Sequence, residues 1–410
     1  MLMLKEASSV KGSFLGSVVR RSRRGVACFL FVFSCAGSGS AQFTPFEATI
    51  ARFDAEVARE VAEDATGCVS VAIFVGNEVI WAKGYGWADI EHRVAATERT
   101  IGRTGSISKS FTAVLMMQLA ERGILDIDEP VEKYFPEINN LADPPAGMRK
   151  ITFRMLASHT AGLIREPELE GAAAGSIYHW EDKILASIPH ISFKTPPLTE
   201  YSYSNIGFGI LGLSSSHAAD VPFMELVREL IFDPLAMTSS TFIVDQPEMW
   251  SRLSVGYSRS RETGEVSAER ATREHFGRGY KVPNGGIYST VGDLAKFAAA
   301  MMGESPVPIL SDESRQELFT LQAPADTYGL GFRVEEDEGE GMKMVGHGGS
   351  VAGYNAYLTF DLVSKTGAAM FRTTSYNPPI EELVKDLVAA GRQEISVPTD
   401  PALSSGEPKR

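Results

Sequence analysis

Residues 105–123 read Gly-Ser-Ile-Ser-Lys-Ser-Phe-Thr-Ala-Val-Leu-Met-Met-Gln-Leu-Ala-Glu-Arg-Gly, a run that is apolar on nearly all sides of a helix and ends at a glycine. A helix with apolar residues all round is typical of a protein interior, and Gly123 supplies a C-terminal stop. The stretch therefore predicts a buried helix from Ser106 to Arg122, with the remaining elements packed around it.

The first turn of this helix carries a serine and a lysine three residues apart, Ser106 and Lys109. Residues at this spacing lie on one face of a helix, so the ammonium group can reach the hydroxyl. The helix N-terminus adds positive potential that would stabilise negative charge developing there. The S-x-x-K pattern alone is weak, because Ser8 and Lys11 repeat it, and Ser106 by itself is equally well explained as a helix cap.

Strand patterns flank this helix at both ends of the chain. Before it, residues 47–63 show helical spacing, and the apolar runs 69–75 and 78–84 around Gly76-Asn77 predict a hairpin. After Gly285, strand patterns follow at 328–334, 342–345, 354–362 and 368–372, and a helical pattern follows at 381–390.

Residues from about 126 to 281 are rich in Pro, Gly and short helical patterns, including an amphipathic stretch at 224–232. We interpret this region as a mostly helical insertion. Strands contributed by segments far apart in the sequence predict an α/β (α+β) fold, in which one antiparallel sheet is flanked by helices and interrupted by this large insertion.

A second chemical motif is Tyr203-Ser204-Asn205, the only Y-x-N in the chain. A buried phenol next to an ammonium group has its anionic form favoured, so Tyr203 is a candidate base or proton relay for Ser106. Asn205 would then orient Lys109 or a substrate amide. The alternative is that Tyr203 is an aromatic anchor beside a helix.

A third motif, Gly346-His347-Gly348-Gly349-Ser350, follows the strand pattern at 342–345. Glycines let a ligand approach the backbone closely, which makes His347 and Gly349 candidate substrate-binding residues together with Asn205. The H-x-G pattern recurs at His275, but there no strand pattern precedes it.

These three motifs, in this order and at about these separations, resemble the family of class C β-lactamases, penicillin-binding carboxypeptidases, D-aminopeptidases and related esterases. Its motifs read S-x-x-K, Y-x-N and K-T-G or H-x-G. The resemblance covers about Ala48 to Ala390 and includes the linking segments 151–163, 232–237 and 283–289.

The resemblance implies an enzyme, a serine hydrolase that forms an acyl-enzyme on an ester, amide, peptide or β-lactam. It makes Ser106 the nucleophile, Lys109 and Tyr203 the proton-handling pair, and Asn205 a polar positioner. The backbone N–H groups of Ser106 and Ser350 would form the oxyanion hole. Which of Lys109 and Tyr203 takes the first proton stays open.

One departure from the family pattern is His347, which stands where β-lactamases carry lysine. A histidine is largely neutral at pH 7, so a substrate carboxylate would be held less firmly. This favours esters, amides and peptides over β-lactams.

Three other interpretations of the sequence are possible. An α/β-hydrolase built on Ser350 needs a catalytic histidine after the serine, and none follows His347. A zinc hydrolase needs clustered ligands, whereas the seven histidines are scattered; His159 is expected to pack or bond locally, and no metal or other cofactor is expected. A non-catalytic or slow-turnover penicillin-binding receptor of the same fold remains the alternative function.

The net charge of −13 disfavours nucleic acid and anionic membranes as partners, which leaves a small molecule or a peptide as substrate.

Four arginines at 20–24 and a short apolar run at 26–33 predict an export signal over residues 1–41, with no stable membrane span. A lipid anchor at Cys35 and mitochondrial import are less favoured alternatives. The hydrolase domain is expected at 42–393, with Cys68 in its core, before a disordered tail at 394–410.

Overall fold

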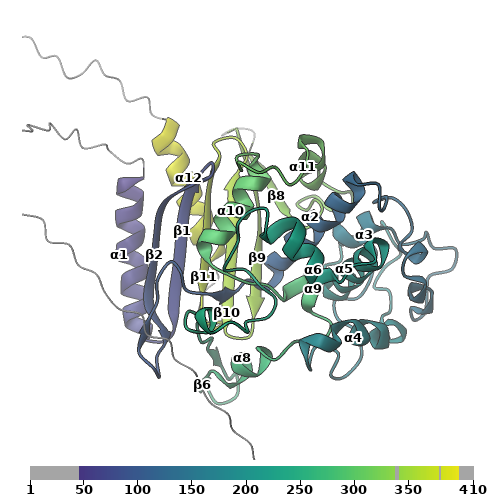
Figure 1. The fold of residues 1–410 in the computed structure, drawn as a ribbon, viewed down its shortest axis with the longest axis horizontal. Coiled ribbons are helices and arrows are strands. Elements are labelled where there is room, and N and C mark those ends of the chain that lie inside the picture. Colours follow the sequence, from purple (N-terminus) through teal and green to yellow (C-terminus); the bar gives the residue numbers. More distant parts are fainter. Residues whose placement is uncertain (1–45, 338–340, 378–379, 397–410) are drawn as a thin grey trace, which may run out of the picture. The chain divides into compact units, whose positions relative to one another are not determined.

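The computed structural model describes residues 46–337, 341–377 and 380–396, which lie in one compact unit (Figure 1). The predicted export signal lies outside these residues. A seven-stranded antiparallel sheet runs in the order β3-β2-β1-β11-β10-β9-β8. Its strands are β1 (Cys68–Val75), β2 (Glu78–Asp89), β3 (Val94–Ala95), β8 (Arg333–Asp337), β9 (Met342–Val351), β10 (Tyr354–Asp361) and β11 (Thr366–Arg372). Strand β1, early in the chain, pairs antiparallel with β11, late in the chain. This agrees with the prediction of one antiparallel sheet built from segments far apart in the sequence.

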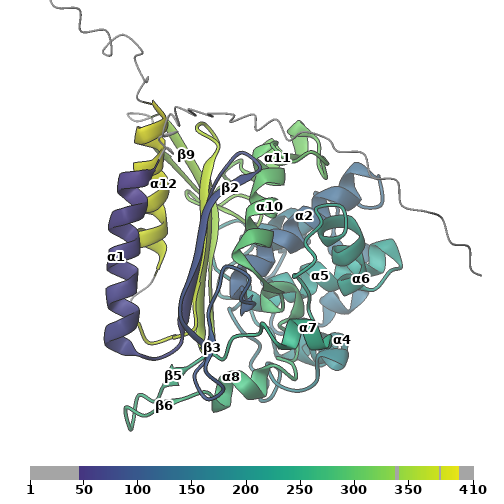
Figure 2. The ribbon, with the colours of Figure 1, turned by 60° about the vertical axis from the view of Figure 1, so that its left-hand side comes forward.

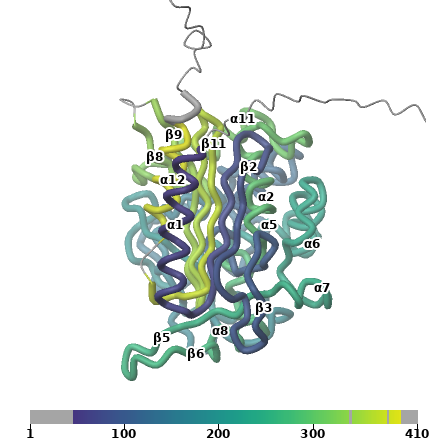
Figure 3. The backbone as a smooth tube through the Cα atoms, turned by 90° about the vertical axis from the view of Figure 1, so that its left-hand side faces the viewer, coloured from purple at the N-terminus to yellow at the C-terminus, as the bar shows by residue number. Residues whose placement is uncertain are grey.

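Two amphipathic helices, α1 (Glu47–Asp64) and α12 (Glu381–Ser396), cover one face of the sheet, as Figures 2 and 3 show. Successive side chains of a strand point to opposite faces, so Val71 packs toward these helices while Phe74 packs toward the main core. Strand β1 is apolar at nearly every position because both of its faces are buried. Cys68, at its start, is buried as expected.

The other face of the sheet packs against α10 (Val291–Met302), and α2 (Ser108–Glu121) packs against α10 through the stacked rings of Phe111 and Phe297. Helix α2 is the apolar helix predicted from 105–123, and its residues from Ser108 to Leu119 are all buried. It begins two residues later than predicted, because a 3₁₀ turn, η1 (Gly105–Ile107), precedes it. Ser106 therefore lies in this tight turn, with the remainder of α2 anchored behind it in the core.

The region between η1 and α10 is mainly helical and lies beyond α2 from the sheet (Figure 1). The predicted helix at 224–232 divides into α6 (Phe223–Val227) and a π-helical turn, η6 (Arg228–Phe232). The other helices and turns are η2 (Val131–Lys133), η3 (Pro136–Asn140), α3 (Phe153–Ala157), η4 (Ile177–His179), α4 (Trp180–Ser187), η5 (Ile188–His190), α5 (Asn205–Ala219), α7 (Pro247–Trp250), α8 (Glu269–Glu274) and α9 (Val282–Gly285), with α11 (Asp312–Leu318) following α10. Two small ladders join β4 (Gly102–Arg103) to β7 (Tyr288–Ser289), and β5 (Ser258–Arg259) to β6 (Val266–Ser267).

Two strand predictions near the C-terminal end are corrected by the structure. The pattern at 328–334 is not a strand from its start, because Gly331 has φ +76° and packs closely against α2, so that β8 begins only at Arg333. Conversely, β9 does not stop at Val345 but continues through the glycine-rich segment to Val351, paired with β10. The third motif is therefore part of a strand rather than a loop after one.

Helix α12 continues to Ser396, past the predicted end at Ala390, and residues 397–410 lie outside the described part of the chain. Among the helices of the described residues, none combines the length and apolarity that crossing a bilayer requires.

Candidate active site

Ser106 and Lys109 meet at the junction of η1 and α2. The Lys109 Nζ donates a hydrogen bond to the Ser106 Oγ at 3.0 Å. The spacing of three residues places both side chains on one face of the turn, and the burial of α2 holds the lysine stem in place. The local pattern in the sequence thus produces a direct contact between the two groups.

The Lys109 ammonium group is fully buried and has two further acceptors, the Asn205 Oδ1 at 2.8 Å and the Asn284 carbonyl oxygen at 3.1 Å. Burial lowers the pKa of Lys109 well below its ordinary value, and the positive charge of Arg165 lowers this pKa further. Both effects favour a neutral amine, which is the form that accepts a proton.

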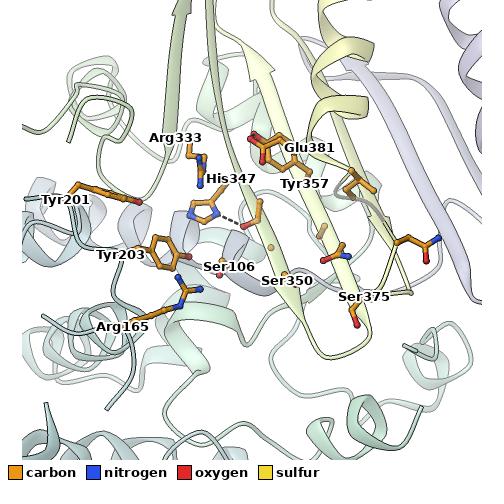
Figure 4. A pocket seen from close by; sticks show the side chains of 16 residues that line it. Ser106, Arg165, Tyr201, Tyr203, Arg333, His347, Ser350, Tyr357, Ser375 and Glu381 are labelled. Atoms are coloured by element: carbon orange, nitrogen blue, oxygen red, sulfur yellow. Dashed lines mark hydrogen bonds between the residues drawn. The ribbon is translucent and has the colours of Figure 1, made fainter. Parts of the chain in front are cut away.

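Tyr203 also lines the pocket beside Ser106 (Figure 4). Its ring centroid lies 4.8 Å from the Lys109 Nζ and 4.8 Å from the Arg165 Cζ. Burial nevertheless raises the pKa of Tyr203, although the nearby Ser106 hydroxyl and the charge of Arg165 act in the opposite direction. The expectation of a favoured phenolate is therefore wrong, because desolvation outweighs the neighbouring charges and keeps the phenol neutral.

Asn205 is the first residue of α5, directly after the N-cap Ser204, whose hydroxyl accepts from the Gly207 N–H. Its Oδ1 accepts from Lys109, while its Nδ2 donates to the Glu166 Oε1 at 2.6 Å. Both ends of the amide are thus engaged by protein groups, and Asn205 does not line the pocket around Ser106. Asn205 was expected to orient either Lys109 or a substrate amide, and in the structure it contacts Lys109.

Glu166 was not foreseen from the sequence. Besides Asn205, it accepts hydrogen bonds from Lys281 at 3.0 Å and from the Tyr280 hydroxyl. These residues lie 39 to 115 positions apart in the chain, so no local spacing connects them. The carboxylate orients Asn205, and its negative charge acts to raise the pKa of Lys109.

The edge of β9 faces Ser106. Strand β8 pairs with β9 only up to Gly346, which leaves the next five residues unpaired on that side. A Cβ atom on Gly349 would lie 1.9 Å from the Thr104 carbonyl oxygen and 3.0 Å from the Ser106 backbone nitrogen. Glycine is required here because the backbones of β9 and η1 are in contact, and Ser350 is thereby held beside Ser106.

His347 is buried on β9, with its ring between two partners. Its Nδ1 donates to the Gly348 carbonyl oxygen at 2.6 Å, since a carbonyl can only accept, and its Nε2 accepts from the Tyr328 hydroxyl at 2.9 Å. Burial lowers the pKa of His347 to about 3. This direction agrees with the expectation that a histidine at position 347 is largely neutral at pH 7.

The pocket around Ser106 has a volume of about 510 Å³ (Figure 4). It contains the predicted residues Ser106, Tyr203, His347, Gly349 and Ser350. Its other lining residues are Arg165, Tyr201, Arg333, Gly348, Asn355, Ala356, Tyr357, Ser375, Asn377, Ile380 and Glu381. The two arginines and the glutamate carry no motif that would have identified them in the sequence.

The structure also bears on the α/β-hydrolase and zinc-hydrolase interpretations. Ser350 lies within a strand of an antiparallel sheet, not at the strand-to-helix turn of an α/β-hydrolase. No three histidine, cysteine or acidic side chains gather into a metal-binding group within the described ranges. His159 packs against Tyr203 with ring centroids 4.2 Å apart, in line with the packing role expected for it, and its Nδ1 accepts from the Ser204 N–H at 3.0 Å, 45 positions along the chain.

Comparison with known proteins gives consistent matches. The family model described as Beta-lactamase matches residues 53–393. "Beta-lactamase-like protein 2" of Dictyostelium discoideum is 26% identical over 345 residues, which cover 80% of this chain and 58% of that protein. The D-alanyl-D-alanine-carboxypeptidase/endopeptidase AmpH of Escherichia coli (strain K12) is 24% identical over 358 residues, which cover 82% of this chain and 87% of that protein.

Among solved structures, the octameric penicillin-binding protein homologue from Pyrococcus abyssi superimposes with a TM-score of 0.68 at 27% identity, over 80% of this chain and 74% of that one. This chain spans little more than half the length of the Dictyostelium relative.

Proposed function

Because this chain belongs to the beta-lactamase family, whose members include serine hydrolases, we propose that it hydrolyses an ester, amide, peptide or β-lactam carbonyl through an acyl-enzyme on Ser106. The observation that carries the proposal is the contact between the Lys109 Nζ and the Ser106 Oγ at 3.0 Å, at the wall of an open pocket. Tyr203 lines the same pocket beside Ser106, so the serine has two candidate proton-handling groups near it.

The directions of the two pKa shifts favour Lys109 over Tyr203 as the group that takes the first proton. The pKa of Lys109 is lowered by burial, whereas that of Tyr203 is raised by burial. In its neutral form Lys109 has a lone pair that accepts from the Ser106 hydroxyl across the 3.0 Å contact, and it takes the hydroxyl proton as the Ser106 Oγ forms its bond to the substrate carbonyl carbon. The developing oxyanion is held by the backbone N–H groups of Ser106 and Ser350, which the contact between β9 and η1 keeps together.

The neutral phenol of Tyr203 is suited to the next step. The carbonyl re-forms, the bond to the leaving group breaks, and the leaving group takes the phenolic proton, which Tyr203 recovers from Lys109. In deacylation, a water molecule gives a proton to this pair as its oxygen bonds the acyl carbon. The Ser106 Oγ then departs and is reprotonated.

Substrate preference within this chemistry depends on His347. Its neutral imidazole is saturated by Tyr328 and Gly348, so it provides neither a charge nor a free donor for the carboxylate of a β-lactam. Esters, amides and peptides are accordingly the favoured substrates.

The proposal is tested with a p-nitrophenyl ester and a fluorophosphonate probe on wild type, Ser106→Ala and the surface control Ser251→Ala. Turnover and labelling should both be lost in Ser106→Ala and retained in the control. Hydrolysis that persists in Ser106→Ala would refute the mechanism. Labelling of wild type without turnover would instead support a receptor of the same fold.

A further inference from the structure

Two backbone N–H groups that flank Tyr203 in the chain both donate to one residue, His159. The Ser202 N–H donates to the His159 carbonyl oxygen at 2.8 Å, and the Ser204 N–H donates to the His159 Nδ1 at 3.0 Å. The rings of His159 and Tyr203 also pack together, with centroids 4.2 Å apart. One residue therefore contacts the Tyr203 ring and holds the backbone on both sides of it.

The backbone of His159 is itself fixed by its place directly after α3. The Thr160 N–H donates to the Met155 carbonyl oxygen at 2.9 Å, which closes the end of this helix. His159 has φ +61°, a left-handed conformation that histidine, asparagine and aspartate adopt more readily than other residues with a Cβ atom. The residue is only 1% exposed, so its support is a buried helix end rather than a surface loop.

The surroundings of the His159 ring favour a role in holding its neighbours. An amide N–H can only donate, so Nδ1 accepts and the proton of the neutral ring is on Nε2. This Nε2 is buried and has no hydrogen-bond partner within the described residues. The ring lies among those of Tyr201, Tyr203, Phe208 and Tyr328. Burial lowers the pKa of His159 well below its ordinary value, so the ring stays neutral and Nδ1 stays an acceptor.

We propose that His159 is a positioning residue for Tyr203, which it holds in the pocket beside Ser106 through its bonds to Ser202 and Ser204. The inference rests on the proposed function, because its consequence for turnover requires that the phenol protonates the leaving group. Misplacement of a reacting group by about 1 Å costs about a hundredfold in rate. Substrates whose leaving groups need that proton, such as alkyl amides and alkyl esters, therefore depend on His159 more than p-nitrophenyl esters do.

The test separates the acceptor atom of His159 from the bulk of its ring. His159→Phe keeps an aromatic ring but has no acceptor, so it leaves the buried Ser204 N–H unpaired. His159→Asn loses the ring, but its Oδ1 is attached to Cγ as Nδ1 is, and asparagine adopts the left-handed conformation readily. His159→Phe should lower kcat for an alkyl ester by at least about tenfold, and His159→Asn should recover most of this loss.

Substrate dependence and coupling to Tyr203 are readouts that a general loss of stability would not produce. His159→Phe should impair the alkyl ester more than a p-nitrophenyl ester. In a Tyr203→Phe background it should lower kcat by less than about twofold more, because the group that His159 positions is already absent. His190→Phe, at an exposed histidine, is the matched control and should equal wild type for both substrates. Thermal unfolding is measured for each variant.

Four results would each overturn the proposal: wild-type activity in His159→Phe, equal losses for the two esters, a His159→Asn enzyme as impaired as His159→Phe, or losses that add in full in the double variant. Should His159→Phe fail to fold, His159→Gln takes its place in the same comparison. The amide oxygen of glutamine lies one bond farther from the backbone than Nδ1 does, so it is not in the place of the lost acceptor.

Crystal structures of wild type and the two His159 variants separate this inference from the proposed function, because they require no turnover. The Tyr203 hydroxyl should be displaced from its place beside Ser106 in His159→Phe and retained there in His159→Asn. If wild type cleaves neither ester, the proposed function fails. The positioning role still stands or falls on whether the phenol moves in His159→Phe.

Discussion

Replacing Gly349 by alanine is expected to lower kcat by about a hundredfold, because it moves an oxyanion donor away from Ser106. The added Cβ would lie 1.9 Å from the Thr104 carbonyl oxygen, and a carbon normally stays about 3.3 Å from such an oxygen, so β9 must retreat from η1 by about 1.4 Å. Neither backbone at this contact can give way as a flexible side chain would.

The magnitude follows from the consequence of that displacement. Loss of one preorganised oxyanion donor lowers kcat by about 10²–10³-fold, and misplacement by about 1 Å has a similar effect. A hundredfold corresponds to about 2.7 kcal/mol in activation free energy.

The matched control is the neighbouring glycine. A Cβ on Gly348 would meet the ring of Tyr357, its cross-strand partner, at 3.0 Å, and this ring can shift by a few tenths of an ångström. Gly348→Ala should therefore reduce kcat by at most about fivefold.

The assay is steady-state hydrolysis of a p-nitrophenyl ester, accompanied by the rate of fluorophosphonate labelling and by thermal unfolding of each variant. A Gly349→Ala enzyme within threefold of wild type, or a Gly348→Ala enzyme that is equally impaired, would refute the reasoning about β9.

Three further outcomes are expected. Lys109→Met, which keeps the volume of the side-chain stem, should lower kcat by about 10²–10⁴-fold. Because the neutral amine is the active form, wild-type kcat/KM should fall as the pH drops through the pKa of Lys109. Glu166→Gln removes a negative charge that raises this pKa, so the acid limb of the pH profile should move to lower pH; an unmoved limb would argue against Lys109 as the base. Tyr203→Phe should impair an alkyl amide or ester more than a p-nitrophenyl ester, because a good leaving group needs no proton; equal losses for both substrates would contradict the role of the phenol. The pKa of His347 is about 3 in the folded state, against 6.5 for the free side chain, so its contribution to stability is present above pH 6.5 and is lost on acidification. Between these two values the free energy of unfolding should fall by up to about 1.4 kcal/mol per pH unit. Denaturant titrations at several pH values should show a smaller slope for His347→Gln than for wild type.

Local patterns determined much of the fold. The helix at 47–63, the hairpin around Gly76-Asn77 and the buried helix after Ser106 depend on periodicity within a few residues, and the structure confirms all three. The strand beginning at Arg333 and the length of β9 were mispredicted. Both depend on what packs against the glycines, because Gly331 abuts α2 and Gly349 abuts η1.

The sequence by itself predicted the contact between Ser106 and Lys109, since residues three apart at a helix start lie on one face, and the structure shows the two groups 3.0 Å apart. It also identified Tyr203 and His347 through their motifs. Only the tertiary structure decided how these groups are tuned: burial makes Lys109 the better base and keeps Tyr203 protonated, and Glu166 orients Asn205 across a long separation in the chain.

The same holds for Arg165 and Arg333, which look like any surface arginines in the sequence and become pocket residues only when α5, β8 and β9 assemble. Desolvation and Coulomb interactions depend on distance in space, and that distance does not exist until the chain has folded.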